Sequence, residues 1–329
     1  PGDRVRAEAR RLLAAGVSGH VFPGAAAALS FRPHTGNVGA VKAHAGKLQA
    51  GHRAADDATL YDLSEITSSV VATAALCLAA RGDIDLDAPV EALLPEVRGG
   101  LLSGTSLRSL CSHRAGLAAW GGLYLDVPHE RGSAAARRWI LSEAARRPNE
   151  GGEHSDLGFI IAGEALARAA GASLDEVVAR EVSEPLGIGA GLFYPAALPS
   201  DKRAGITANC APTERCAWRG RLVKGAVQDE NAAALGGVAG HAGLFGTATA
   251  VARFGRAIID GELFGLDVLQ QALHDPNDRG HVRFGWDRKH GSPPPCGRRM
   301  SASTFGRLGF TGTSVFIDPE HDVVIALLT

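Results

Sequence analysis

Lysine is scarce in this sequence, and no lysine stands at the spacing that a serine–lysine catalytic pair requires. The 329 residues include five lysines, and the residues three positions before them are glycine, histidine, proline, arginine and tryptophan. A serine nucleophile activated by a lysine one helical turn later is therefore absent in every register. No Gly-x-Ser-x-Gly sequence occurs either, which excludes the serine elbow of the α/β-hydrolases.

The sequence also lacks the signatures of nucleic-acid, membrane and phosphate binding. Its 34 basic and 35 acidic residues leave a formal charge of −1, and no basic stretch is interleaved with aromatics, so we expect no nucleic-acid partner. No apolar run reaches the length of a membrane span. The glycines between Gly236 and Gly246 lack a Gly-Lys-Ser/Thr ending, so they predict no phosphate loop, and we expect no cofactor.

Histidine and acidic residues do not form a recognisable metal motif. Residues 274–278 read His-Asp-Pro-Asn-Asp and are followed by His281, but Asp-Pro-Asn-Asp is first of all a turn sequence. His129-Glu130 lacks the second histidine of a zinc-binding His-Glu-x-x-His motif. We therefore expect no metal site.

The five cysteines are odd in number and include no Cys-x-x-Cys pair. Cys77 lies in an apolar stretch, where a buried free thiol is the simplest interpretation. A disulfide between Cys210 and Cys216 is the less favoured alternative. This usage slightly favours a reducing, cytoplasmic compartment. A periplasmic or secreted protein stays open as an alternative, because a removed leader would leave no trace in a sequence that begins at Pro1.

The order of periodic segments predicts a mixed α/β fold. With 45% hydrophobic and 21% charged residues, the chain can bury a sizeable core. The patterns predict helices at 3–15, 65–80, 157–170 and 250–261, the third capped by Asp156 and a further helix capped by Ser173, and strands at 25–31, 38–45, 308–317 and 323–328. We expect one domain, 1–329, whose antiparallel sheet is built from both chain ends with flanking helices. The sheet lobe would comprise about 1–82 and 236–329, and an inserted helical lobe about 83–235.

Six segments, in this order, resemble motifs of class C β-lactamases, their esterase relatives and D-Ala-D-Ala peptidase-like enzymes. They are Tyr-Asp-Leu-Ser-Glu-Ile-Thr-Ser at 61–68, Leu-Arg-Ser-Leu-Cys-Ser-His-Arg-Ala-Gly-Leu at 107–117, Glu-His-Ser-Asp-Leu-Gly-Phe at 153–159, Pro-Leu-Gly-Ile at 185–188, the Asp-Glu-Asn-Ala and glycine-rich block at 229–245, and Gly-Phe-Thr-Gly-Thr-Ser at 309–314. The resemblance covers nearly the whole chain. It implies a β-lactamase/DD-peptidase-like fold with a ligand-binding cleft between its lobes.

The family's reactive groups are replaced at four positions. The resemblance places Glu65 where the family has its nucleophilic serine and Ser68 where it has its lysine. His154 corresponds to the family's tyrosine, and Arg307 to the lysine or histidine of its third motif. A register shifted by one residue offers Ser64 as nucleophile, but its partner would then be Thr67, which cannot act as a base near neutral pH.

The resemblance therefore predicts a pseudoenzyme that binds a small-molecule or peptide ligand, or a protein partner, through the former active-site cleft. The expected cleft residues are the four replaced positions and three that match the family: Glu65, Ser68, His154, Asp156, Arg307, Gly309 and Thr311. We further expect an ion pair between Glu65 and Arg307 with His154 alongside, and structural hydrogen bonds from His113 and His241. Two alternatives stay open. One is an esterase- or amidase-like hydrolase with altered residues, such as Glu65 and His154 as an acid–base pair. The other is a structural partner of an active paralogue.

Overall fold

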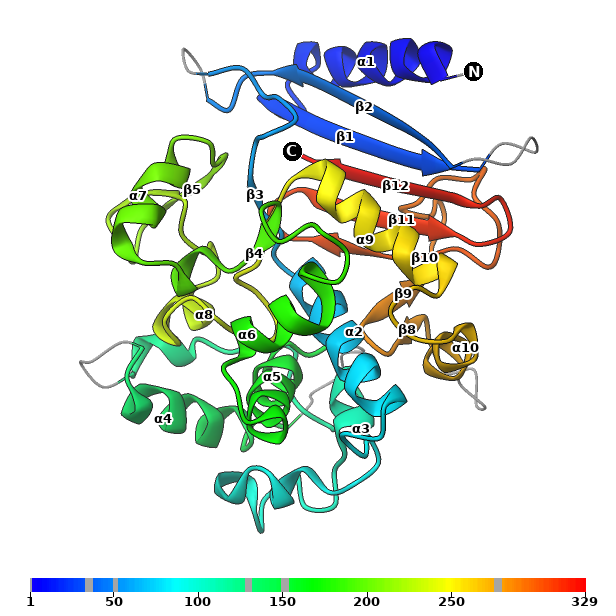
Figure 1. Ribbon diagram of the computed structural model, residues 1–329. Helices are drawn as coiled ribbons and strands as arrows, with labels where there is room; N and C mark the ends of the chain where they lie inside the picture. Colours follow the sequence, from blue (N-terminus) through cyan, green and yellow to red (C-terminus); the bar gives the residue numbers. More distant parts are fainter. Residues whose placement is uncertain (1, 33–37, 50–52, 128–131, 149–153, 275–279) are drawn as a thin grey trace.

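The two ends of the chain meet in one antiparallel sheet. The computed structural model describes residues 2–32, 38–49, 53–127, 132–148, 154–274 and 280–329. Seven strands lie in the order β2-β1-β12-β11-β10-β9-β8, and each neighbouring pair is antiparallel (Figure 1). Their bounds are β1 Gly24–Phe31, β2 Gly39–Gly46, β8 Val282–Arg283, β9 Trp286–Arg288, β10 Phe305–Gly309, β11 Thr313–Asp318 and β12 Val323–Leu328. The predicted fold class is therefore confirmed.

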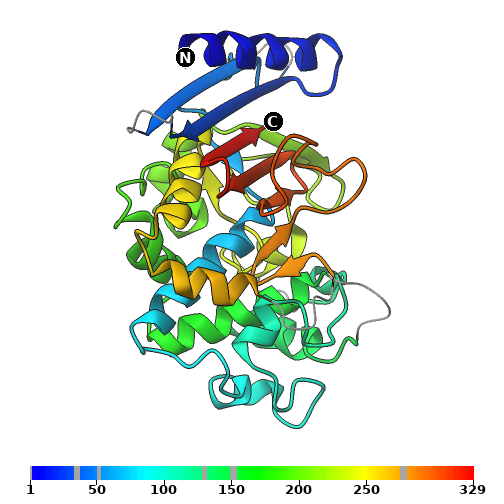
Figure 2. The ribbon, with the colours of Figure 1, turned by 90° about the vertical axis from the view of Figure 1, so that its right-hand side faces the viewer.

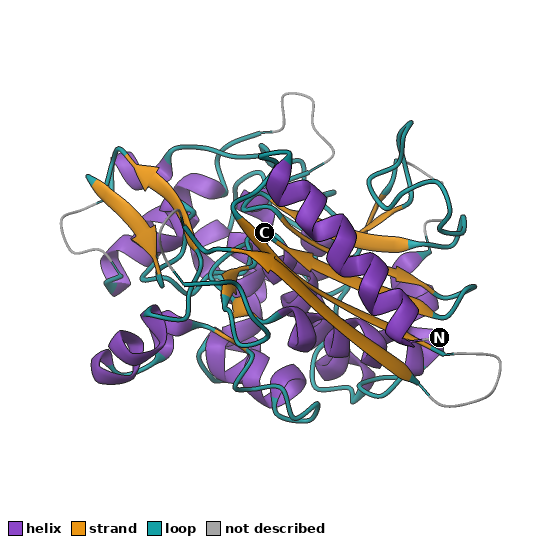
Figure 3. Ribbon diagram, turned by 90° about the horizontal axis from the view of Figure 1, so that it is seen from above, coloured by secondary structure: helices purple, strands orange, loops and turns teal. Residues whose placement is uncertain are grey.

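Strand β1 separates two layers because successive side chains of a strand point to opposite faces. Ala25 and Ala27 pack on one face with Leu13 of helix α1 (Gly2–Ser18). Ala26 and Ala28 face the main core on the other side, to which helix α9 (Ala248–Asp260) also belongs. Figures 2 and 3 show α1 lying across the outer side of β1 and β2. Small alanine side chains allow both layers to approach the strand closely.

Helix α2 (Ile66–Ala80) passes through the middle of the molecule. Every residue from Ile66 to Leu78 is buried, and the composition is apolar on all sides of the helix, as expected of a core helix. Gly285 allows one close approach, since a Cβ atom at this position would lie 2.5 Å from the Cβ of Ala72. The burial of α2 fixes its N-terminal end, which carries the candidate site, against strands β10 and β11.

Between residues 83 and 235 the described elements are mostly helices. They are α3 Leu107–Cys111, α4 Ala134–Ala144, α5 Asp156–Ala170, α6 Leu174–Val178, α7 Ser200–Thr207 and α8 Glu230–Ala234, with short helical turns at Val90–Ala92, Pro95–Val97, Leu123–Leu125, Ala179–Ser183 and Pro195–Ala197. Helix α10 (Leu266–Leu273) follows α9. Two small sheets complete the fold, β3 (Tyr61–Asp62) with β7 (Phe245–Gly246) and β4 (Leu192–Phe193), and β5 (Pro212–Cys216) with β6 (Arg221–Lys224). The division into two lobes stays a prediction.

The structure corrects two local predictions and confirms two others. The single strand predicted at 308–317 is two strands, β10 and β11, because the chain turns at residues 310–312 with Gly312 at φ +87°. The N-cap of α5 is Ser155, whose Oγ accepts from the Gly158 N–H, and Asp156 is the first helical residue. All five cysteines are free, as the favoured interpretation predicted, and the alternative disulfide between Cys210 and Cys216 is not formed. The capping box predicted at Ser173 is confirmed.

Among the described residues, no single helix is long and apolar enough to cross a membrane.

Candidate ligand pocket at the end of helix α2

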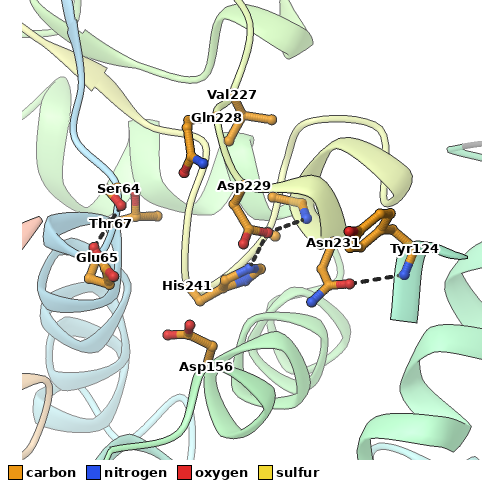
Figure 4. Close-up of polar contacts among 12 residues, drawn as sticks. Ser64, Glu65, Thr67, Tyr124, Asp156, Val227, Gln228, Asp229, Asn231 and His241 are labelled. Atoms are coloured by element: carbon orange, nitrogen blue, oxygen red, sulfur yellow. Dashed lines mark hydrogen bonds and ion pairs between the residues drawn. The ribbon is translucent and has the colours of Figure 1, made fainter. Parts of the chain in front are cut away.

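A pocket of about 310 Å³ opens beside the N-terminal end of α2. Its wall combines the end of α2, the start of α5, the turn after β10 and the two loops around residues 228–230 and 241–242 (Figure 4). The lining residues are Ser64, Glu65, Trp120, Asp156, Gln228, Asp229, Glu230, His241, Ala242 and Phe310. Segments from widely separated parts of the sequence therefore form one cavity.

Ser64 and Glu65 form the corner between β3 and α2. Ser64 has a φ of +48°, a left-handed conformation that is uncommon for a residue with a side chain. Its N–H donates to Oδ1 of Asp62 (3.0 Å), which holds the corner in place. Glu65 is the N-cap of α2, and its Oε2 accepts from Ser64 Oγ (2.6 Å) and from the Phe310 N–H (2.6 Å). A carboxylate at the positive end of a helix is favoured by about 0.3–1 kcal/mol.

Asp62 lies beneath this corner and is 2% exposed. Burial raises its pKa to about 7, although the backbone N–H groups of Ser64 and Gln228 stabilise the carboxylate. The negative charges of Asp229 and Glu65 add to the rise. Asp62 therefore takes up its proton far above the pH at which an exposed aspartate would.

Ser68, the position at which the resemblance expects a lysine, lies in the core. The residue is 0% exposed, it does not line the pocket, and its Oγ has no hydrogen-bond partner among the described residues. Thr67, one residue earlier, accepts a hydrogen bond at Oγ1 from the Leu244 N–H (3.2 Å). No basic group therefore replaces the missing lysine on this turn of α2.

His154 and Arg307 belong to a chain of polar contacts behind the pocket. Nε2 of His154 lies 2.8 Å from Oδ1 of Asp156, and Nδ1 lies 3.0 Å from a guanidinium nitrogen of Arg307. Because arginine can only donate, Nδ1 accepts and Nε2 donates its proton to Asp156. Arg307, which is 3% exposed, also pairs with Asp287 at 3.2 and 3.3 Å.

The ion pair predicted between Glu65 and Arg307 is not formed in the part of the chain that the structure describes. Arg307 is held by Asp287 and His154, and Glu65 accepts from Ser64 and Phe310 instead. The prediction failed because Asp287, on the neighbouring strand β9, offers Arg307 a carboxylate at 3.2 Å, and nothing in the sequence indicated that pairing.

Asp229 and His241 form a second buried pair, on the wall opposite α2 (Figure 4). Nε2 of His241 lies 2.8 Å from Oδ1 of Asp229, which also accepts from the Ala232 N–H (2.7 Å) and so caps α8. Burial lowers the pKa of His241, but the charge and hydrogen bond of Asp229 outweigh it, so that pKa lies above its ordinary value. Burial likewise raises the pKa of Asp229, yet His241 brings it below its ordinary value. Both shifts favour the ionised form of the pair.

Of the seven predicted cleft residues, only Glu65 and Asp156 line this pocket. His154 and Arg307 lie behind Asp156, and Gly309 precedes Phe310 on β10. Thr311 donates from Oγ1 to the Asp62 carbonyl (2.6 Å) and so ties the turn after β10 to β3. The structure thus groups these residues around the end of α2, with most of them supporting the pocket wall.

His113 is the structural hydrogen-bonder that the sequence predicted. Its Nδ1 accepts from the Ser155 N–H (2.8 Å), and its ring lies 4.4 Å from the ring of His154, centre to centre. Burial lowers the pKa of His113 well below its ordinary value, and the neighbouring His154 and Arg307 act in the same direction. His113 is therefore neutral and holds the start of α5 in position.

The comparisons with known proteins agree with this architecture. The Beta-lactamase family model matches residues 9–329. The chain belongs to the beta-lactamase family. It is 27% identical over 302 residues to the N-acetylmuramyl-L-alanine amidase of Bacillus subtilis (strain 168), covering 82% of this chain and 68% of the amidase. It is 34% identical over 158 residues to esterase EstB of Burkholderia gladioli, covering 43% of this chain and 40% of the esterase.

Solved structures of the beta-lactamase family and its relatives share the fold. The octameric penicillin-binding protein homologue from Pyrococcus abyssi superimposes with a TM-score of 0.74 at 16% identity, covering 98% of this chain and 72% of the homologue. At this identity the likeness establishes the fold alone. Glu65, the residue that the resemblance aligns with the family's nucleophilic serine, is the N-cap of α2.

Sequence reasoning missed several lining residues of this family member's pocket. Asp229 and Glu230 lay in the Asp-Glu-Asn-Ala block, which was used only to support the resemblance, and Trp120 carried no motif. His241 was expected to be structural, and its bond to Asp229 is consistent with that.

The predicted turn at 275–278 lies outside the described residues. Among the described ones, Glu214, Cys216 and Glu230 place one thiol and two carboxylate donors within 4.8 Å of one another, the nearest approach to a metal-ligand set.

Proposed function

We propose that this beta-lactamase family member is catalytically degenerate and binds a small-molecule or peptide ligand in the pocket at the end of α2. The observation that carries the proposal is the position of the Glu65 carboxylate. Its Oε2 accepts the Phe310 N–H, and Glu65 is the N-cap residue of α2. Backbone N–H groups and helix ends of this kind stabilise an oxyanion in acyl-transfer enzymes. Here the Glu65 carboxylate, a permanent anion, accepts the N–H group that an oxyanion would need.

The residues at the family's proton-transfer positions also offer no available base. Ser68 Oγ is buried and cannot act as a base. Both ring nitrogens of His154 are occupied, one accepting from Arg307 and the other donating to Asp156. A histidine in this state has no free lone pair with which to take a proton from a nucleophile. Removing a nucleophile–base pair typically costs about 10⁴–10⁶-fold in turnover.

The open pocket favours a ligand-binding role over a purely structural one. A cavity of about 310 Å³ lies in the size range of small-molecule sites, and ionisable groups converge on it. Glu65 and Arg307 do not fill this volume. Glu65 is bound by the Phe310 N–H, and Arg307 is paired with Asp287.

One contact supports a rival function, an altered serine hydrolase. Ser64 Oγ donates to Glu65 Oε2 over 2.6 Å, so the serine of the shifted register has a carboxylate beside it where Thr67 was expected. The strained backbone of Ser64 is of the kind found at functional sites. The same Oε2 accepts the Phe310 N–H, however. The carboxylate that would act as the base is therefore bound to the N–H group that would stabilise an oxyanion.

Turnover of an activated ester separates the two functions. We expect wild-type protein to hydrolyse 4-nitrophenyl acetate no faster than its Ser64→Ala variant, because neither has an activated nucleophile. A wild-type rate at least about 10²-fold above that of Ser64→Ala would favour the hydrolase, since that is the smallest contribution expected of a working general base. Thermal unfolding of both proteins checks that the variant is folded.

A further inference from the structure

The pocket carries an excess of negative charge. Four of its lining residues are acidic, Glu65, Asp156, Asp229 and Glu230, and its described lining includes no lysine or arginine. His241, the basic group in that lining, is paired with Asp229. Three carboxylates therefore remain without a cation inside the cavity, and their combined potential attracts positive charge.

Each of these three carboxylates has an oxygen that no described residue occupies. Glu65 uses only Oε2, for Ser64 and Phe310, and Asp156 uses Oδ1 for His154. Glu230 contacts the Cys216 thiol through Oε1 over 3.8 Å. Oε1 of Glu65, Oδ2 of Asp156 and Oε2 of Glu230 are therefore left as acceptors.

A buried polar group in the pocket wall independently indicates a ligand. His241 is 1% exposed, its ring forms part of the lining, and its Nδ1 has no hydrogen-bond partner within the described residues (Figure 4). Leaving a buried polar atom without a hydrogen-bond partner is unfavourable. Nε2 faces the Asp229 carboxylate, so Nδ1 is the ring nitrogen left for a ligand. The raised pKa of His241 favours a proton on Nδ1 as well, and an organic ligand can supply the acceptor for it.

Two exposed aromatic side chains stand in the same lining. Trp120 is 47% exposed and Phe310 is 76% exposed, which are high values for residues of this size. Exposed aromatics at a pocket offer apolar contact, and their ring faces attract organic cations. The lining thus combines free carboxylates, one donor and aromatic surface.

We propose that the pocket binds a small primary amine that also carries a hydrogen-bond acceptor and an apolar group. The ammonium group is placed among Glu65, Asp156 and Glu230, the acceptor at His241, and the apolar group against Trp120 and Phe310. This inference rests on the proposed function, whose ligand it assigns to a chemical class.

Three probes of similar size test the assignment by isothermal titration and ligand-observed NMR. Phenylalaninol carries the ammonium, hydroxyl and phenyl groups, 3-phenylpropan-1-ol lacks the ammonium, and 3-phenylpropanoate reverses the charge. We expect phenylalaninol to bind wild-type protein at least about fivefold more tightly than the neutral alcohol, the effect of about 1 kcal/mol of charge attraction in water. Glu65→Gln and Asp156→Asn should each weaken the binding of phenylalaninol by about the same factor. Glu320→Gln, which removes an exposed charge from the turn between β11 and β12, should leave binding unchanged.

Two results would overturn the inference. If the alcohol or the propanoate binds as tightly as phenylalaninol, the pocket binds a ligand without selecting for positive charge. The inference then fails and the proposed function survives. If none of the three binds, the assignment to amines fails, while the loss of acyl transfer is decided separately by ester turnover and acylation. Equal weakening by Glu320→Gln would show only general attraction to an acidic surface and would also contradict the inference.

Discussion

Restoring the family's reactive groups is expected to give this protein the esterase activity that we propose it lacks. The quadruple variant Glu65→Ser, Ser68→Lys, His154→Tyr and Arg307→His should hydrolyse 4-nitrophenyl acetate at least about 10²-fold faster than wild type. The physical reason is that the scaffold around these positions is retained. The substituted serine would stand at the end of the buried helix α2, facing the Phe310 N–H once the Glu65 carboxylate no longer occupies it.

The single variant Glu65→Ser is the matched control for this gain. It supplies a hydroxyl without a base and should stay at the wild-type rate, because a serine alone is a weak nucleophile. Circular dichroism and thermal unfolding must show that the quadruple variant is folded, since a lysine at position 68 enters a fully buried site. A folded quadruple variant with wild-type activity would contradict the account, because the loss would then extend beyond the four side chains.

The second large effect concerns stability and follows from the buried position of Arg307. Replacing it with methionine, of similar length, should lower the free energy of unfolding by about 2–4 kcal/mol. The substitution removes the partner of Asp287 and leaves Nδ1 of His154 without a donor, although Asp287 is 21% exposed and is partly solvated. Arg307→Lys keeps the charge but cannot contact Asp287 and His154 at the same time. Its free energy of unfolding should lie between those of wild type and Arg307→Met.

A surface pair provides the control for the Arg307 prediction. Arg253 makes a two-pronged contact with Glu262 at 2.8 and 2.6 Å, and both side chains are about one-third exposed. Arg253→Met should change the unfolding free energy by less than about 1 kcal/mol, since water solvates the freed carboxylate. Thermal unfolding at neutral pH compares the variants. Similar melting temperatures for Arg307→Met and wild type would refute the structural role assigned to Arg307.

The fold could be predicted from the sequence because its signals are periodic and local. The alanine strand at 25–31 and the apolar helix starting after Glu65 were placed within one residue of their observed bounds. The break between β10 and β11 was missed because Thr311-Gly312 lies inside a run that otherwise alternates like one strand. The hairpin of β5 and β6 was missed because it carries charged residues on both strands.

The candidate site could be predicted only in part. The resemblance predicted that Glu65, His154, Asp156 and Arg307 lie near one another. In the structure His154 contacts both Asp156 and Arg307, and Glu65 shares the pocket lining with Asp156. It could not predict which carboxylate would pair with Arg307, because Asp287 comes from a short strand with no motif of its own. The acidic character of the pocket depends on loops that converge only after folding, so the charge pattern along the chain gave no sign of it.

Intact-mass spectrometry after incubation with benzylpenicillin tests the loss of acyl transfer most directly. The resemblance aligns Glu65 with the residue that attacks a carbonyl in the family, and we propose that no base serves it, so the mass of the wild-type protein should stay unchanged under an excess of the drug. A stable increase equal to the mass of the penicillin, mapped to a peptide containing Ser64 or Glu65, would contradict the central claim that this site no longer forms an acyl-enzyme.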